Sequence, residues 1–200
     1  MRAAAIILSG GKSSRMGTNK ALLKINDKTN IERIRDRLKP HFDDIILVTN
    51  NSEDYRFLGL KMTKDQFPGM GPLAGLHAGL SVSDYETNII VACDMPFVSG
   101  ELAETFCSKL SGHDAVVPVI HGKQQPLFAV FQKGITPIIE KCLLDEKLRM
   151  KHLLDHLNVY YVTEKELPGF NDLEQIFFNM NDPDEYKDAL RREEDHQERK

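Results

Sequence analysis

Residues 4–20 read AAIILSGGKSSRMGTNK, an apolar run followed directly by a loop of glycines, hydroxyl groups and cations. The apolar part, Ala4 to Leu8, lacks polar alternation, which is typical of a strand covered on both faces. Glycines let backbone N–H groups approach phosphate oxygens, and successive amides form an anion-binding concavity. Arg15, as a planar fork, and Lys20, as a point charge, can neutralise a polyphosphate. The pattern favours a triphosphate-binding loop, although a solvated strand-to-helix turn has a similar composition.

Two familiar phosphate-binding motifs do not account for this loop. A Walker A loop that ends at Gly11-Lys12-Ser13 would need glycine at position 6, which is Ile6. The loop also lacks the G-x-G-x-x-G pattern of dinucleotide-binding domains. A different kind of nucleotide-binding loop is therefore expected.

Outside the loop, short apolar runs alternate with segments of helical spacing. Strand-like runs cover residues 45–49, 89–92, 115–119, 127–131 and 159–162, and apolar residues recur at helical spacing in 31–38, 102–110 and 135–143. Strands alternating with helices predict one α/β unit, a three-layer Rossmann-like fold with a mostly parallel central sheet.

The length favours one domain, which we predict over residues 1–190. Ser99 is a predicted helix N-cap, and Asp182-Pro183-Asp184-Glu185 predicts that the last helix begins near Pro183. Residues 191–200, RREEDHQERK, contain no apolar side chain, so they can extend that helix but are not expected to pack. We predict a charged C-terminal tail there.

Composition restricts the partners and the compartment. The formal charge is 26 − 30 = −4, so no global basic field exists to hold nucleic acid. The apolar start is too short to span a membrane. The odd number of widely spaced cysteines, Cys93, Cys107 and Cys142, indicates reduced thiols in a cytosolic protein. We therefore expect a cytoplasmic location, small phosphorylated ligands, and neither nucleic-acid nor membrane binding.

Asp94 is the strongest candidate for a metal ligand. It follows the apolar run that ends at Ala92, at the carboxyl end of a strand, where ligands usually bind in open α/β sheets. An acidic residue at such a place is costly without a cation or hydrogen-bond donors, and Mg²⁺ bound through a carboxylate and phosphate oxygens meets that need. A helix cap or a loop hydrogen bond is the alternative. Cys93 beside it is expected to be a core residue rather than a catalyst.

Five ordered segments resemble one family. Leu8-Ser9-Gly10-Gly11-x-Ser13-x-Arg15-Met16-Gly17-x-x-Lys20 resembles the signature loop of nucleotidyltransferases with the nucleotide-diphospho-sugar transferase fold. Gly71-Pro72-Leu73-Ala74-Gly75, the segment around Asp94, Gln124-Gln125-Pro126-Leu127 and Asn179-Met180-Asn181-Asp182-Pro183 follow in the order found in that superfamily. Together they are most similar to the molybdenum cofactor guanylyltransferase family.

The chain departs from the family pattern at three loop positions. Ser9 stands where the family usually has alanine, and Thr18 and Asn19 stand where it often has glycine and aspartate. The glycines and both cations are retained. Gly10 matches the guanylyl type, Leu-Ala-Gly-Gly, rather than the cytidylyl type, Leu-Ala-Ala-Gly.

The resemblance implies roles for individual residues and a reaction. It places the nucleotide at Leu8, Ser9, Gly10, Gly11, Lys20, Asp65, Gly71 and Asp94, the acceptor at Gln125, Pro126, Asn179 and Asn181, and catalysis at Arg15, Lys20 and Asp94, with Mg²⁺ on Asp94. From the residues alone, the Gly71 segment can equally be a tight helix start, and the two asparagines can be turn and cap residues. The implied reaction joins GMP from GTP to the terminal phosphate of molybdopterin and releases pyrophosphate.

Two other functions fit the same segments. A cytidylyl- or sugar-phosphate nucleotidyltransferase would share the glycine loop, Lys20 and Asp94. A noncatalytic carrier of GTP or molybdopterin would bind without releasing pyrophosphate. Other proteins of molybdenum cofactor biosynthesis or delivery are candidate partners.

Overall fold

A single large sheet organises the chain, as seen in a computed structural model that describes residues 2–10 and 19–198. Its strands are β1 (Ala3–Leu8), β4 (Asp44–Val48), β5 (Lys61–Thr63), β6 (Thr87–Ala92), β7 (Ala115–Ile120), β8 (Lys123–Gln124), β9 (Phe128–Gln132) and β10 (Val159–Thr163), and a separate hairpin pairs β2 (Lys24–Ile25) with β3 (Lys28–Thr29). The predicted strand runs are confirmed, with ends moved by one or two residues.

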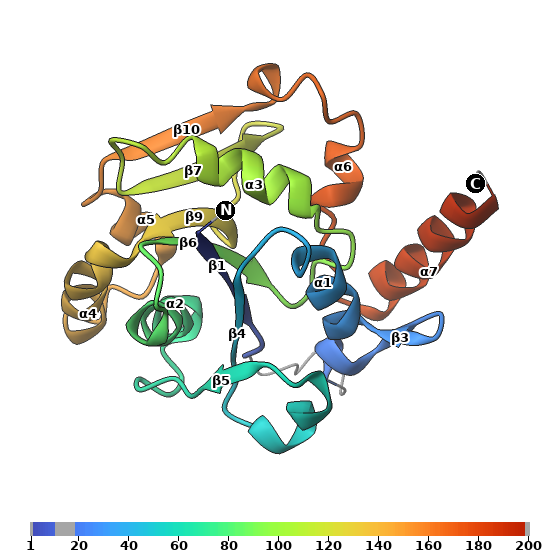
Figure 1. The fold of residues 1–200 in the computed structure, drawn as a ribbon, viewed down its shortest axis with the longest axis horizontal. Coiled ribbons are helices and arrows are strands. Elements are labelled where there is room, and N and C mark those ends of the chain that lie inside the picture. Colours follow the sequence, from blue (N-terminus) through green and yellow to red (C-terminus); the bar gives the residue numbers. More distant parts are fainter. Residues whose placement is uncertain (1, 11–18, 199–200) are drawn as a thin grey trace.

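Helices cover both faces of this sheet (Figure 1). They are α1 (Asn30–Leu38), α2 (Gly71–Val82), α3 (Gly100–Ser108), α4 (Thr136–Leu144), α5 (Met150–Leu154), α6 (Leu173–Ile176) and α7 (Pro183–Glu198), with 3-10 turns η1 (Lys20–Leu22), η2 (Ser52–Leu58), η3 (Lys133–Ile135) and η4 (Glu164–Glu166). The predicted three-layer α/β fold is confirmed. Among the described residues, no helix is long and apolar enough to cross a membrane.

The sheet has the strand order β10-β7-β9-β6-β1-β4-β5. β1 pairs in parallel with β4 on one side and with β6 on the other, whereas β9 is antiparallel to both β6 and β7. The chain reaches β4 through α1 and returns to β6 through α2, so the direction of winding reverses at β1. Ligands of open α/β sheets bind outside the carboxyl ends of the strands at such a reversal.

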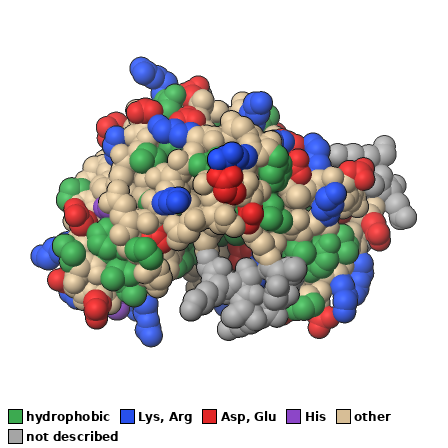
Figure 2. Space-filling view, turned by 90° about the horizontal axis from the view of Figure 1, so that it is seen from below, with side chains coloured by type: hydrophobic (Ala, Val, Ile, Leu, Met, Phe, Trp, Pro, Cys, Tyr) green, Lys and Arg blue, Asp and Glu red, His purple; other side chains and the backbone are tan. Residues whose placement is uncertain are grey.

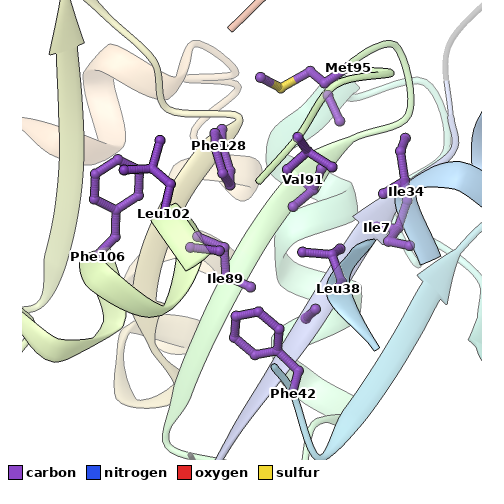
Figure 3. Packing of buried hydrophobic residues seen from close by; sticks show 14 of the residues in the cluster. Ile7, Ile34, Leu38, Phe42, Ile89, Val91, Met95, Leu102, Phe106 and Phe128 are labelled. Atoms are coloured by element: carbon purple, nitrogen blue, oxygen red, sulfur yellow. The ribbon is translucent and has the colours of Figure 1, made fainter. Parts of the chain in front are cut away.

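Alternate residues of the central strands β1, β4, β6, β7 and β9 belong to two separate cores. Ile7 of β1 and Ile89 and Val91 of β6 pack with Ile34 and Leu38 of α1 (Figure 3). The intervening residues of the same strands pack against α2, α4 and α5 on the other face. Because strand side chains alternate between faces, burial on both sides explains why these strands are continuous apolar runs.

Helix α2 lies unusually close to β1. A Cβ added at Gly79 would overlap Cγ2 of Ile6 and lie 3.0 Å from its Cδ1, and one at Gly75 would lie 3.2 Å from Cδ2 of Leu8. The missing side chains therefore let the helix pack directly on the strand that leads into the loop.

Both predicted helix starts are confirmed. The Ser99 hydroxyl accepts a hydrogen bond from the Leu102 amide, and α3 begins at the next residue, Gly100. The Asp182 carboxylate accepts hydrogen bonds from the amides of Asp184 and Glu185, and α7 begins at Pro183. The Glu185 carboxylate accepts its hydrogen bond from Asn181 rather than from the cap residue.

The expectation that residues 191–200 do not pack is wrong for part of that segment. Helix α7 continues to Glu198, and Glu193 is buried, where its carboxylate pairs with Arg33 of α1. Arg192 lies over the ring of Phe178, 4.7 Å from its centroid. Long charged side chains can pack through their stems and through a buried partner, which a count of apolar residues does not reveal. The division into residues 1–190 and a tail stays a prediction.

Candidate active site

A pocket of about 1060 Å³ opens at the carboxyl edge of the sheet, beside the end of β1. Its walls come from the ends of β1, β4 and β6, the start of α2, and the turns η1 and η2. The lining residues are Leu8, Ser9, Gly10, Asn19, Lys20, Val48, Thr49, Asn50, Asn51, Tyr55, Asp65, Gly69, Gly71, Pro72, Gly75, Cys93 and Asp94. The position at the reversal of the sheet agrees with the general rule for ligand sites in this architecture.

Backbone hydrogen bonds continue beyond the strands and hold their ends together at the pocket floor. The Ser9 amide donates to the Val48 carbonyl at 2.9 Å, and the Cys93 amide donates to the Leu8 carbonyl at 3.1 Å. The segments that follow β1, β4 and β6 therefore leave the sheet side by side, although they lie far apart in sequence. This arrangement places residues 9, 49 and 94 around one cavity.

Lys20 is the cation that the described residues contribute to the pocket lining. It begins η1, a turn whose first free amide, that of Ala21, donates to the Asn19 side chain at 3.2 Å. The Lys20 ammonium also donates to Oδ1 of Asn181 at 3.4 Å. The side chain is thus held at the pocket, where it can pair with a phosphate group.

Asp94 fits the binding of a cation. Its Oδ1 is buried and has no hydrogen-bond partner among the described residues. Burial raises the pKa of this carboxyl group, while the positive charge of Lys20 acts in the opposite direction. A buried, unpaired carboxylate oxygen is expensive, and a divalent cation held jointly with phosphate oxygens would compensate that cost. Within the described chain, no cluster of three or more acidic, histidine or cysteine residues forms a complete metal cage.

Asp65 and Gly71, two of the predicted nucleotide-binding residues, also line this pocket. The Asp65 carboxylate accepts a hydrogen bond from the Phe67 amide at 2.6 Å, and the Asp65 amide donates to the side chain of Asn50 at 3.2 Å. Gly71 has a φ of 72°, in the left-handed region, where the chain turns into α2. The tight helix start and the pocket wall are therefore the same structural feature.

The predicted acceptor residues lie outside this pocket. Gln125, Pro126, Asn179 and Asn181 are absent from its lining, as far as the chain is described. The Asn179 side-chain amide donates to the Phe177 carbonyl at 3.1 Å, so its turn role is observed. The Met180 amide donates to the Asp94 carbonyl at 2.8 Å. The segment before α7 thus braces Asp94 and, through Asn181, Lys20.

Two predicted residues, Gly11 and Arg15, fall in residues 11–18 and lie outside the described part of the chain. Leu8, Ser9, Gly10, Lys20, Asp65, Gly71 and Asp94 are brought together at one pocket. Of the predicted nucleotide and catalytic residues that the structure describes, all line it.

Sequence reasoning missed the pocket residues that follow β4. Thr49, Asn50 and Asn51 come directly after this strand, and Tyr55 lies in the next turn, η2. The available signal was their place at the carboxyl end of a predicted strand, the same signal that identified Asp94. Tyr55 carries no such signal, because it lies within η2, away from the end of the strand, and packs in the hydrophobic core.

Cys93 was predicted to be a core residue, but it is only half-buried: it packs against the core on the α1 face and also lines the pocket. Burial raises its pKa to about 12, so the sulfur stays protonated near neutral pH. A neutral thiol is a poor nucleophile, and the pocket therefore has no role for this residue in covalent chemistry.

Charge at the site is local rather than global. Figure 2 views the molecule from the edge where β1 ends, and on this face positive and negative side chains are interspersed. The pocket itself combines the cation Lys20 with the carboxylates of Asp65 and Asp94. Such a site suits a small phosphorylated ligand bound together with a metal ion.

The three-layer α/β fold carries glycines, a lysine and an aspartate with one oxygen unpaired among the described residues, at the carboxyl edge of β1 and β6. These features define a nucleotidyltransferase of the nucleotide-diphospho-sugar transferase fold. Residues 5–159 match the family model described as the MobA-like NTP transferase domain, and the chain belongs to this family.

Relatives of known family agree along nearly the whole chain. A probable molybdenum cofactor guanylyltransferase from Pelotomaculum thermopropionicum is 39% identical over 184 residues, which cover 92% of this chain and 89% of that protein. A protein of the same name from Carboxydothermus hydrogenoformans is 36% identical over 185 residues, which cover 92% and 93%. The crystal structure of molybdopterin-guanine dinucleotide biosynthesis protein A from Archaeoglobus fulgidus superposes with a TM-score of 0.82 at 27% identity and covers 94% of this chain and 97% of that one. The resemblance found in the motifs is confirmed.

Proposed function

We propose that this protein is a molybdenum cofactor guanylyltransferase, which transfers GMP from GTP to the terminal phosphate of molybdopterin and releases pyrophosphate. Relatives that cover at least nine tenths of this chain carry that name. Gly10, at the pocket floor, matches the guanylyl form of the loop and supports GTP over CTP.

One observation carries the proposal. Lys20 and Asp94 come from segments 74 residues apart (94 − 20), yet they line one pocket, and Oδ1 of Asp94 has no protein partner among the described residues. A cation and an unpaired carboxylate at one cavity are what a triphosphate with its metal ion requires. A site that only bound an uncharged ligand would not need to leave a buried carboxylate oxygen without a partner.

The reaction is a displacement at phosphorus that needs no enzyme nucleophile. A terminal phosphate oxygen of the acceptor attacks the α-phosphorus of GTP in line. A new P–O bond forms while the bond from the α-phosphorus to the bridging oxygen breaks, and pyrophosphate leaves with the electron pair. The chain's contribution is to position the two phosphates and to stabilise charge.

Lys20 stabilises the negative charge that grows on the leaving pyrophosphate, and Asn181 holds its ammonium group in place. Asp94 is the proposed ligand of Mg²⁺, held by the backbone hydrogen bond from Met180 to its carbonyl. Bound there, the ion would neutralise phosphate oxygens and polarise the phosphorus under attack. Arg15, whose place in the structure is not described, is proposed to share the triphosphate charge.

The acceptor is proposed to approach from the side of Gln125, Pro126, Asn179 and Asn181. Asn179 and Asn181 lie beside Asp94, since the amide of Met180 between them donates to the Asp94 carbonyl. Gln125 and Pro126 are assigned to the acceptor by the resemblance of their segment to the family. The side-chain amides of Gln125, Asn179 and Asn181 can pair with phosphate and with the amide-like edge of a pterin. Partners among cofactor delivery proteins and the cytoplasmic location stay predictions.

The test is to incubate the purified protein with Mg²⁺, molybdopterin and α-labelled GTP or CTP, and to follow both label entering the pterin and pyrophosphate release. We expect labelled dinucleotide and one equivalent of pyrophosphate from GTP only. Label from CTP would replace the guanylyl assignment with a cytidylyl one. Tight GTP binding without pyrophosphate release would support a carrier and overturn the proposed transfer.

A further inference from the structure

Tyr55 connects two segments of the pocket through a single oxygen atom. Its ring belongs to the core on the α1 face and its side chain is only 2% exposed. The Tyr55 hydroxyl oxygen lies 2.6 Å from Oγ of Ser9, directly after β1, and 2.7 Å from Nδ2 of Asn19, directly before η1. Three segments that are distant in sequence therefore meet at this hydroxyl group.

The contact between Tyr55 and Asn19 fixes both the Asn19 side chain and the start of η1. An asparagine Nδ2 can only donate, so it donates to the Tyr55 oxygen, while Oδ1 of the same side chain accepts from the Ala21 amide. Both ends of the Asn19 amide are thereby engaged, and the start of η1 is held in one orientation. The next residue is Lys20, the cation that the described part of the chain contributes to the pocket.

Packing alone does not explain the hydroxyl group. A phenylalanine at position 55 would keep the ring in the same apolar core, as at Phe42 and Phe106 of that core. Without the hydroxyl, Ser9 would lose this contact and Asn19 would lose its acceptor at the edge of the pocket. Burial raises the pKa of Tyr55, so the phenol stays neutral near pH 7 and its hydrogen bonds persist there.

We infer that Tyr55 is a positioning residue for the nucleotide. Its hydroxyl ties Ser9 to Asn19, and by fixing Asn19 it sets where Lys20 presents its charge. This inference rests on the proposed function for the choice of GTP as the ligand. It adds a residue to which the comparisons assign no role, and it gives a use to Ser9 and Asn19, two positions where this chain departs from the pattern of the family it resembles.

The direct test removes the hydroxyl alone, in Tyr55→Phe. One hydrogen bond at a partly buried site contributes about 1–2 kcal/mol, so we expect kcat/KM for GTP to fall by roughly 5- to 30-fold. KM for molybdopterin should stay within about twofold, because a positioning effect on Lys20 concerns the nucleotide. A merely structural role would change the kinetics of both substrates together with the melting temperature.

A matched control is available in Tyr160→Phe. The Tyr160 hydroxyl donates to Glu166 at 2.6 Å, at a place remote from the pocket lining. This substitution removes the same atom from a tyrosine that does not line the pocket, so it should leave GTP kinetics unchanged.

A double-mutant cycle tests whether Tyr55 affects GTP binding through Lys20 or independently of it. GTP affinity, measured with a fluorescent GTP analogue, should fall in Tyr55→Phe and in Lys20→Ala, but adding Tyr55→Phe to Lys20→Ala should cause little further loss. Wild-type affinity in Tyr55→Phe, or two losses that simply multiply, would overturn the inference. Failure of the wild-type protein to bind GTP at all would instead overturn the proposed function.

Discussion

The two sides of Asp94 differ in how their polar side chains are used. Toward β1 and α2, polar groups line an open pocket, and Oδ1 of Asp94 has no protein partner in the described chain. Toward α7, the amide of Asn179 is bound by a backbone carbonyl, and Asn181 contacts both Lys20 and Glu185. The first side is open to a ligand, whereas Asn179 and Asn181 on the second, which is the proposed acceptor side, also help to hold the first side in place. Polar residues that follow a strand and polar residues that precede a helix give similar signals in the sequence, yet in the structure the two groups have different roles.

The largest effect is expected at the boundary between the two sides, in Asp94→Asn. Loss of the proposed metal ligand should lower kcat at least about 1000-fold, since a bound ion contributes several kcal/mol to phosphate transfer. Turnover is measured by pyrophosphate release, with the exposed Asp155→Asn as the control. Near-normal turnover of a folded Asp94→Asn protein would contradict the proposal that Asp94 binds the metal ion.

In the absence of metal, Asp94→Asn should be at least as stable as the wild-type protein. Because burial raises the pKa of Asp94, its ionised form opposes folding, and that penalty is present above the raised pKa and disappears once the carboxyl is protonated. Melting in EDTA at about pH 8 should therefore occur at or above the wild-type temperature, and the difference should vanish below about pH 4, where the folded and unfolded states both carry the proton. A lower melting temperature at pH 8 would mean that Asp94 has a structural partner.

The second effect is expected within the nucleotide side, in Lys20→Ala. Removing one preorganised positive charge from a phosphate-transfer site should cost roughly 100- to 1000-fold in kcat/KM for GTP. The exposed Lys123→Ala is the control for loss of one lysine. If Lys20→Ala instead changed only KM for molybdopterin, the division into a nucleotide side and an acceptor side would be wrong.

A stability effect is expected where the nucleotide side rests on the sheet, in Gly79→Ala. The added methyl group would overlap the branched side chain of Ile6, which cannot move away easily inside β1. We expect a loss of about 1–3 kcal/mol in the free energy of unfolding, measured by urea denaturation. Gly134→Ala, where a Cβ meets nothing within 4 Å, should cost much less.

The smallest effect is expected on the acceptor side, in Gln125→Ala. If its side chain contacts molybdopterin, KM for the pterin should rise by roughly 10-fold, as for one lost hydrogen bond to a charged group. GTP affinity should not change, because Gln125 does not line the pocket. A change in GTP affinity with unchanged pterin kinetics would reverse the proposed assignment.

Local patterns in the sequence predicted the frame of the fold well. Continuous apolar runs such as Ala4 to Leu8 identified strands buried on both faces, and the cap residues Ser99 and Asp182 identified helix starts. These features depend on neighbours in sequence. The buried Arg33–Glu193 pair could not be predicted, because it joins α1 to a segment whose charges suggested only solvation.

The site was predicted in part for the same reason. Asp94 comes just after β6, so the carboxyl-edge rule predicted its place, whereas Lys20 was predicted from the composition and motif of the loop after β1. The sequence did not predict a site role for Tyr55, because that role depends on contacts with Ser9 and Asn19, which lie 46 and 36 residues away. Likewise, Asn181 was identified as an acceptor residue, but its contact with Lys20 spans 161 residues and is visible only in the folded chain.

The central claim is that one pocket holds a nucleoside triphosphate between Lys20 and a metal ion on Asp94. The most direct measurement is calorimetric titration of the wild-type protein, Lys20→Ala and Asp94→Asn with GTP, each with Mg²⁺ and with EDTA. We predict that Mg²⁺ strengthens GTP binding to the wild type, that Lys20→Ala binds weakly in both conditions, and that Asp94→Asn no longer responds to Mg²⁺. Equal GTP affinity and an equal response to Mg²⁺ in all three proteins would contradict the claim.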